Sequence, residues 1–215
     1  MIKIFSRAGW LALAVSLTAC KAPTMVLPGY QESASGTGFA ITDARPEKDK
    51  TTEILSYWAT ACDYGISRVG DERTQPPKLV FLRRNLEDAL GARLKGATLI
   101  VTRYRIHINA RAQTRSQLNG MYTGIVPGML AAAGEGCTKE ETSGGWFDAS
   151  EVTTPFPPAI VEIEAALNGK TYSVRSVYSS RGKDLDDAGT PELFNAMRKA
   201  NAALVEQLAR DLPAP

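Results

Sequence analysis

Residues 159–179 have the sequence AIVEIEAALNGKTYSVRSVYS, which predicts a β-hairpin. Asn168-Gly169 is a strong signal for a two-residue type I′ turn between antiparallel strands. Placing Leu167 opposite Lys170 predicts the cross-strand pairs Glu162–Arg175, Ile163–Val174 and Ala165–Tyr172. Apolar residues alternate along the first strand, so we expect one buried face formed by Val161, Ile163, Ala165 and Leu167.

A second long strand is predicted over residues 97–110, ATLIVTRYRIHINA. Alternation places the following residues on one face: Ile100, Thr102, Tyr104, Ile106 and Ile108. Arg103, Arg105 and His107 fall on the other face, with alternate residues about 6.8 Å apart. Such a cationic stripe suits anionic lipid headgroups, lipopolysaccharide or an acidic partner. Alternatively, Glu162 and Glu164 of a neighbouring strand would pair with the stripe and cancel it.

Two amphipathic helices are predicted, one before these strands in the chain and one after them. Residues 78–95 carry leucines spaced by three and four positions, with Pro77 at the start and Gly96 at the end. The leucines of this face are Leu79, Leu82, Leu86, Leu90 and Leu94. Residues 191–210 form the second helix, with Thr190 as its N-cap. Its apolar stripe is Leu193, Met197, Ala200, Leu204 and Leu208.

Shorter strands complete the expected sheet. Residues 38–46 predict a strand that ends in Asp43-x-Arg45-Pro46, where a local ion pair would hold the strand end. Two more short strands are expected near 54–60 and 64–69. We therefore predict one α+β domain over residues 38–215, with a mainly antiparallel sheet and two amphipathic helices packed on one face.

The N-terminus resembles a bacterial lipoprotein signal. Lys3 and Arg7 precede a nine-residue apolar run, which is too short for a permanent membrane span. Leu17-Thr18-Ala19-Cys20 then resembles a lipobox, which implies cleavage after a 1–19 signal peptide and acylation of Cys20. Residues 20–37 would form a lipidated, flexible tether rich in Pro, Gly and Ser. Lys21 favours the outer membrane, facing the periplasm, by analogy with enterobacterial sorting.

Cleavage would change the cysteine and charge balance. The full chain has 25 basic and 23 acidic residues, and removal of Lys3 and Arg7 leaves the two numbers equal. With Cys20 acylated, Cys62 and Cys137 remain as an even pair in an oxidising compartment, which favours a disulfide. The alternatives are one reactive thiol, or two buried free thiols.

Residues 118–148 are unusually rich in glycine and enclose an uncharged apolar stretch over 121–133. This stretch is too short to span a bilayer and too apolar for an ordinary solvated loop. It is either a loop folded over the core or a contact surface for a partner protein or the membrane. The candidate contacts within it are Met121, Tyr122, Met129 and Leu130.

The lipobox, Asp43-x-Arg45-Pro46 and the following strand–helix–strand pattern resemble small envelope lipoproteins, specifically the YajG-like family, over residues 17–110. That family implies a non-enzymatic envelope protein and supplies no catalytic residues. The glycine-rich segment and the pair Cys62 and Cys137 depart from the family pattern.

Composition excludes several other classes. The 215 residues are 44% hydrophobic and 22% charged, which argues against a wholly disordered or collagen-like chain. A net charge of +2 gives no indication of nucleic-acid binding. One histidine and three cysteines offer little for a metal site, and we expect no cofactor other than the covalent lipid.

The sequence therefore predicts a lipoprotein that acts as a binding or assembly subunit in the cell envelope, with an envelope protein or anionic lipid as partner. The rival binding hypothesis is a lipid-handling accessory of an envelope transporter, which requires an apolar groove beside the basic strand. The enzyme hypothesis, a thiol hydrolase using Cys62 and His107, is disfavoured by the expected disulfide.

Overall fold

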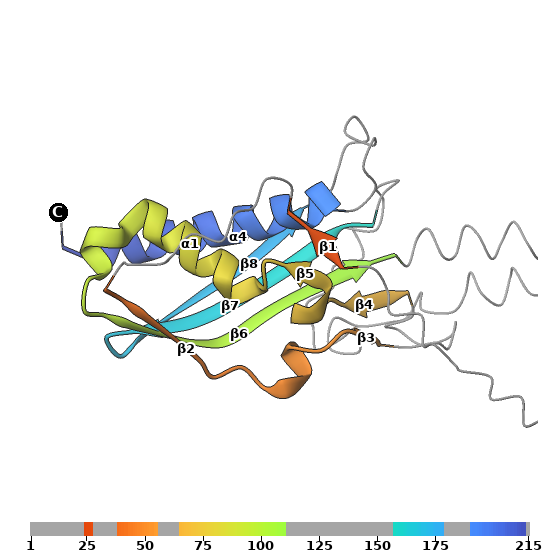
Figure 1. The fold of residues 1–215 in the computed structure, drawn as a ribbon, viewed down its shortest axis with the longest axis horizontal. Coiled ribbons are helices and arrows are strands. Elements are labelled where there is room, and N and C mark those ends of the chain that lie inside the picture. Colours follow the sequence, from red (N-terminus) through yellow and green to blue (C-terminus); the bar gives the residue numbers. More distant parts are fainter. Residues whose placement is uncertain (1–23, 28–37, 56–64, 111–156, 179–189, 214–215) are drawn as a thin grey trace, which may run out of the picture.

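The computed structural model describes residues 24–27, 38–55, 65–110, 157–178 and 190–213 (Figure 1). A six-stranded sheet has the order β3-β4-β6-β7-β8, and β2 also pairs with β6. The strands are β2 (Ala40–Asp43), β3 (Glu53–Ile54), β4 (Ile66–Arg68), β6 (Thr98–Asn109), β7 (Ala159–Leu167) and β8 (Lys170–Tyr178). All pairs in this sheet are antiparallel except β2–β6, so the predicted α+β class is confirmed.

The β7–β8 hairpin has the predicted register. Leu167 lies opposite Lys170, and Glu162, Ile163 and Ala165 pair as expected. Asn168 and Gly169 have φ values of 52° and 79°, as a type I′ turn requires. The apolar face of β7 is buried, which fixes the register because a slip of one residue would expose it.

Strand β6 contains a bulge that the sequence analysis did not predict. The register with β7 shifts between Val101 and Arg103, so one extra residue is inserted at Thr102. Because of this extra residue, the buried and exposed positions of β6 before Thr102 are the reverse of those predicted. Leu99 and Val101 are therefore buried in the core, whereas Ile100 is 41% exposed. The predicted apolar face is wrong at Ile100 and correct from Tyr104 onward, because Tyr104 and Ile106 are buried in the core.

Two helices cover one face of the sheet (Figure 1). α1 (Lys78–Leu90) continues as the 3₁₀ turn η3 (Gly91–Leu94), and α4 spans Thr190–Asp211. Both predicted apolar stripes lie in one core, although Leu79 is only half-buried. The rings of Phe81 and Phe194 pack edge to face with centroids 5.6 Å apart, which joins the two helices. The Tyr104 hydroxyl donates a 2.9 Å hydrogen bond to the Asn201 side chain and fastens α4 to the sheet.

A small parallel pair lies beside this domain. β1 (Met25–Val26) pairs with β5 (Thr74–Gln75), which follows the 3₁₀ turn η2 (Asp71–Arg73). β1 falls within the stretch expected to be a flexible tether, so this part of the tether is docked on the domain.

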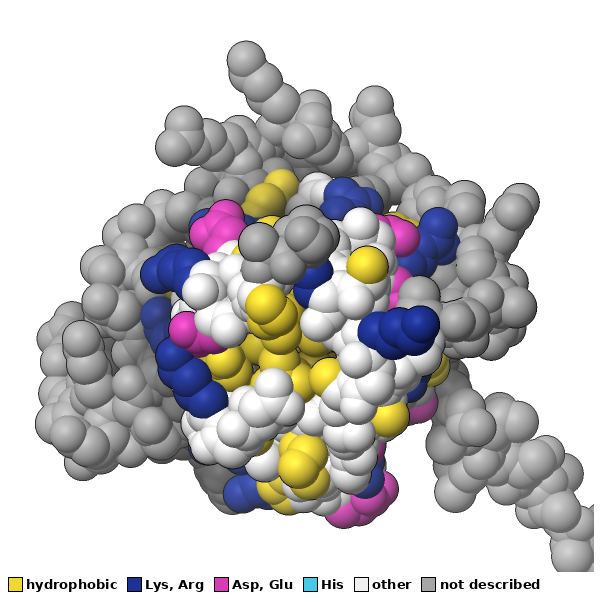
Figure 2. All heavy atoms as spheres, turned by 90° about the vertical axis from the view of Figure 1, so that its left-hand side faces the viewer, with side chains coloured by type: hydrophobic (Ala, Val, Ile, Leu, Met, Phe, Trp, Pro, Cys, Tyr) yellow, Lys and Arg dark blue, Asp and Glu magenta, His cyan; other side chains and the backbone are white. Residues whose placement is uncertain are grey.

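The strand expected near 64–69 occurs as β4, and the start of the strand expected near 54–60 coincides with the end of β3. Residues 56–60 lie outside the described residues. Several predicted features lie outside the described residues: Cys20, Cys62, Cys137 and the candidate contacts Met121, Tyr122, Met129 and Leu130. At the end of the domain that carries the β7–β8 turn, a small apolar area is bordered by polar and charged side chains (Figure 2).

Candidate functional site

The basic stripe of β6 lies on the sheet face opposite the helices, but its arginines are ion-paired. Arg103 Nη1 lies 3.3 Å from Glu164 Oε2, as the alternative hypothesis expected. Arg105 lies opposite Glu162 in the register, yet its Nε contacts Asp49 Oδ1 at 2.7 Å. Burial raises the pKa of Glu162, although the arginines nearby lower it. These pairs reduce the cationic character that the sequence suggested.

His107 differs from its neighbours on the stripe because it is 3% exposed. Burial lowers its pKa to about 3, with further contributions from the positive charges of Arg68, Arg105 and Lys78. The imidazole is therefore neutral at pH 7. His107 does not contribute a charge to an exposed patch, and its pairing with Cys62 stays a prediction because Cys62 lies outside the described residues.

Beside the stripe lies a group of charged residues, of which Arg45, Asp49 and Lys78 are buried. β2 pairs with β6 up to Val101, and β4 pairs with it from His107. Between these two stretches, the 3₁₀ turn η1 (Glu47–Asp49) reaches β6 through the Asp49–Arg105 pair. We define the charge cluster as Asp43, Arg45, Asp49, Asp71, Lys78 and Arg105. It contains three acidic and three basic side chains.

Arg45 lies at the centre of the charge cluster, with its side chain 1% exposed. Its guanidinium binds the Asp43 carboxylate through Nε and Nη2, at 2.9 and 3.0 Å. It binds Asp71 through Nη1 and Nη2, at 3.2 and 2.7 Å. Burial acts to lower the pKa of Arg45, but the hydrogen bonds to both carboxylates outweigh it and raise the pKa. The same contacts lower the pKa of Asp43 to about 2, against the opposing effect of burial.

Lys78 is the first residue of α1 and is fully buried. Its ammonium donates to the carbonyl oxygens of Asp49 and Val69, at 2.8 and 3.0 Å, and lies 3.2 Å from Asp71 Oδ1. Burial lowers the pKa of Lys78 despite the attraction of Asp71. The charge cluster thus joins the end of β2, the 3₁₀ turns η1 and η2, the start of α1 and the middle of β6.

Only part of this charge cluster was predicted from the sequence. The local Asp43–Arg45 pair was expected and is present. The roles of Asp49 and Lys78 were missed, because their partners lie far along the chain and no local pattern marks them. Arg45 is therefore a structural tie among several elements, with both of its carboxylate partners supplied by the domain itself.

A groove opens at the end of the sheet formed by β3, β4 and the end of β6. Its volume is about 650 Å³. The apolar lining is supplied by Met25, Ile54, Val69 and Ile108. Its polar lining includes Arg68, which forms an ion pair with Glu53. This groove therefore combines apolar walls with charged groups.

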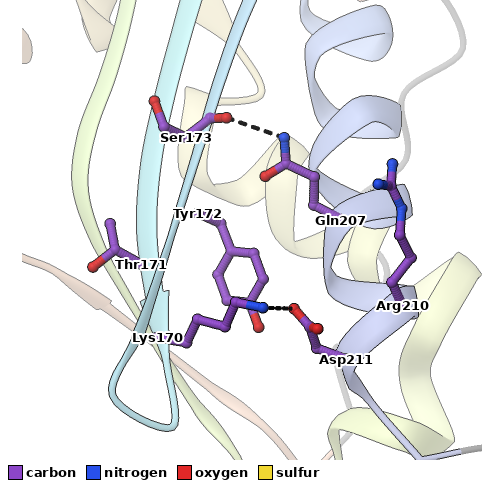
Figure 3. Close-up of a pocket in the computed structure, with 7 residues that line it drawn as sticks. All are labelled: Lys170, Thr171, Tyr172, Ser173, Gln207, Arg210 and Asp211. Atoms are coloured by element: carbon purple, nitrogen blue, oxygen red, sulfur yellow. Dashed lines mark hydrogen bonds and ion pairs between the residues drawn. The ribbon is translucent and has the colours of Figure 1, made fainter.

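A second, smaller pocket of about 300 Å³ lies between the start of β8 and the end of α4 (Figure 3). Lys170 Nζ lies 2.6 Å from Asp211 Oδ2 and 5.5 Å from the centre of the Tyr172 ring. Gln207 donates a 3.1 Å hydrogen bond to the Ser173 carbonyl. These contacts join the helix to the last strand of the sheet, so the pocket resembles a structural joint more than a ligand site.

Further along, Lys199 of α4 donates a 2.8 Å hydrogen bond to the carbonyl of Val177. Together with the Gln207 contact, this gives two carbonyls of β8 a side-chain donor from α4. Helix side chains of this kind shield the edge of a sheet from pairing with another chain.

The parts of the chain that the structure describes hold no group of three or more His, Cys, Asp or Glu side chains placed to bind a metal ion. Among the described residues, no helix has the length and apolar character needed to cross a membrane. Comparison of the chain with protein-family models, curated proteins and solved structures finds no match.

Proposed function

We propose that this protein is a non-enzymatic lipoprotein of the bacterial envelope, anchored through Cys20, that acts as a binding or assembly subunit. The observation that carries the proposal is the lipobox-like Leu17-Thr18-Ala19-Cys20 after a charged and apolar leader. The expected location is the outer membrane, facing the periplasm. The proposed partner is an envelope protein, with anionic lipid as the alternative.

The described domain suits a scaffold that presents surfaces to a partner. Arg45 and Lys78 donate hydrogen bonds to carboxylates and carbonyls within the domain, and these contacts stabilise it. Side chains of α4 donate hydrogen bonds to two carbonyls of the edge strand β8. Arg103, whose side chain is 39% exposed, remains accessible on the sheet face opposite the helices.

A second candidate function is lipid handling for an envelope transporter. The groove lined by Met25, Ile54, Val69 and Ile108 favours it, because lipid handling needs an apolar recess beside the basic strand. Arg68 at the same groove would contact an anionic headgroup in this hypothesis.

The anchor is tested by labelling cells with a clickable palmitate analogue. The Cys20→Ser variant is expected to lose the label and to leave the membrane fraction. The matched Cys62→Ser variant is expected to keep both the label and the location. Label retained by Cys20→Ser would overturn the proposed anchor.

The binding role is tested by photocrosslinking in cells from Arg103 and Met129. A discrete protein adduct at either position would support the assembly function and identify the partner. Adducts to lipid or lipopolysaccharide would favour the lipid-handling function. Absence of adducts at both positions, in protein that is correctly lipidated, would reject these two contact surfaces and the binding function built on them.

A further inference from the structure

We propose that the surface formed by β1, β3 and the groove between them lies against the leaflet that holds the lipidated Cys20, with Val26 and Ile54 in contact with phospholipid. This inference rests on the proposed anchor at Cys20. We call this surface the anchor-side surface and define it by Met25, Val26, Ile54 and Ile108.

The proposed anchor and the domain are separated by only a short length of chain. Four residue steps separate Cys20 from Thr24. At a maximum of about 3.6 Å for each residue, they span no more than ~14 Å. A free tether of 17 residues would instead reach about 55–60 Å. The lipid therefore holds the start of β1 near the headgroups.

Strand β1 is hydrogen-bonded to the domain. The Thr24 hydroxyl donates a 3.2 Å hydrogen bond to the Glu72 carbonyl. Met25 and Val26 pair with Thr74 and Gln75, and the Leu27 amide donates to the Gln75 carbonyl at 2.8 Å. Because β1 cannot move away independently, the short link also limits the orientation of the whole domain.

Apolar side chains are exposed beside this anchor point. Val26 is 49% exposed and Ile54 is 45% exposed, and they are the most exposed large hydrophobic side chains among the described residues. Met25 and Ile54 line the same groove. Figure 1 shows β1, β3 and β4 at the same end of the molecule, away from the β7–β8 turn.

Polar groups indicate how deeply this surface would lie. Thr52, Glu53, Ser67 and Arg68 share the groove with the apolar side chains. Charged and hydroxyl groups stay at the headgroup level, whereas apolar side chains reach toward the acyl boundary. The anchor-side surface therefore suits shallow contact with the leaflet.

The test places the photocrosslinker p-benzoylphenylalanine at Val26, Ile54 or Ile100 of the full lipidated protein in cells. Ile100 is the matched control, because it is 41% exposed and lies eight residues along β6 from Ile108, about 26 Å away. Phospholipid adducts are expected at Val26 and Ile54, at least fivefold above those at Ile100. The intact mass of the same sample reports acylation of Cys20.

Equal adduct yields at all three positions, in protein whose mass shows the lipid, would overturn the orientation and leave the anchor standing. A mass without lipid would overturn both proposals. A variant with ten Gly and Ser residues inserted between Cys20 and Thr24 gives a second measurement. It is expected to keep the lipid and lose most of the adducts at Val26, and unchanged adducts would contradict a role for the short link.

Discussion

The domain contains two lysine–aspartate pairs in which the pKa of the lysine is shifted in opposite directions. Lys170 and Asp211 approach to 2.6 Å at an exposed joint, and the hydrogen bond raises the pKa of Lys170. Lys78 and Asp71 are farther apart, at 3.2 Å, and burial lowers the pKa of Lys78 in spite of its partner. The shorter contact therefore does not contribute more to stability. Exposure to water determines how much free energy each ion pair contributes.

The buried pair also differs in the number of groups that depend on it. The Lys78 ammonium serves two backbone carbonyls in addition to Asp71. Loss of a buried donor leaves such acceptors without a partner, which costs more than the net value of the original contacts. The exposed pair can exchange its contacts for water.

The largest expected effect is that of Arg45→Met. The substitution would remove the buried guanidinium that Asp43 and Asp71 share. Asp43 would keep only its 3.7 Å contact with Lys50, and Asp71 its 3.2 Å contact with Lys78. We expect the free energy of unfolding to fall by about 3–5 kcal/mol, the usual range for removing one partner of a buried ion pair. Urea denaturation monitored by circular dichroism measures the change.

Lys48→Met is the control for this experiment, because Lys48 is exposed on the same turn as Asp49. Its unfolding midpoint should stay near that of the unchanged protein. A loss below about 1 kcal/mol for Arg45→Met would show that the buried pair resembles an exposed one.

The next effect is acid sensitivity arising from His107, which borders the charge cluster. Its folded pKa of about 3 lies below the ordinary value of 6.5, so the unfolded chain binds more protons between these pH values. Stability is therefore expected to fall as the pH drops from 6.5 toward 3, by up to roughly 4 kcal/mol. Asp43 adds a further loss only between pH 3.8 and about 2.

Because the chain has one histidine, a single imidazole resonance reports this pKa by NMR. The resonance should not titrate between pH 5 and 8. In the His107→Gln variant, the dependence of the unfolding free energy on pH between 4 and 6.5 should flatten. A midpoint near 6.5 in the native protein would contradict the buried, neutral histidine.

The third effect is that of Lys78→Met, the buried member of the two lysines. Lys78→Met retains the apolar length of the side chain but removes the donor to Asp49 and Val69. We expect a loss of about 2–4 kcal/mol, since two buried carbonyls lose their partner. Thermal and urea unfolding provide the measurement. A variant as stable as the unchanged protein would show that these carbonyls find other donors.

Features whose partners lie close in the chain were predicted from the sequence. The hairpin was predicted residue by residue, because alternation and Asn168-Gly169 are both local signals. The Asp43–Arg45 pair was also local, because its two residues are only two positions apart in the chain. Both helices followed from their leucine-rich faces.

Features that depend on distant residues were not predicted. The bulge at Thr102 depends on pairing with β7, where the Thr102 hydroxyl donates to a Glu164 carboxylate oxygen at 2.9 Å. The Lys78–Asp49 contact spans 29 positions. The parallel pairing of β2 likewise depends on tertiary placement. Of the candidate contacts, only Arg103, Arg105 and His107 lie in the described residues, and their partners altered the predicted cationic stripe.

The smallest expected effect is that of Lys170→Met, the matched counterpart of Lys78→Met. The Lys170 side chain is 60% exposed, and water replaces its contact with Asp211 when the ammonium is removed. Because exposed ion pairs contribute little to stability, the unfolding midpoint should not change measurably. A double-mutant cycle with Asp211→Asn should give a coupling near zero that weakens further in 1 M salt, where charges are screened within about 3 Å. A coupling that persists in high salt would mean that the joint between β8 and α4 excludes water, and the proposed difference between the two pairs would then be lost.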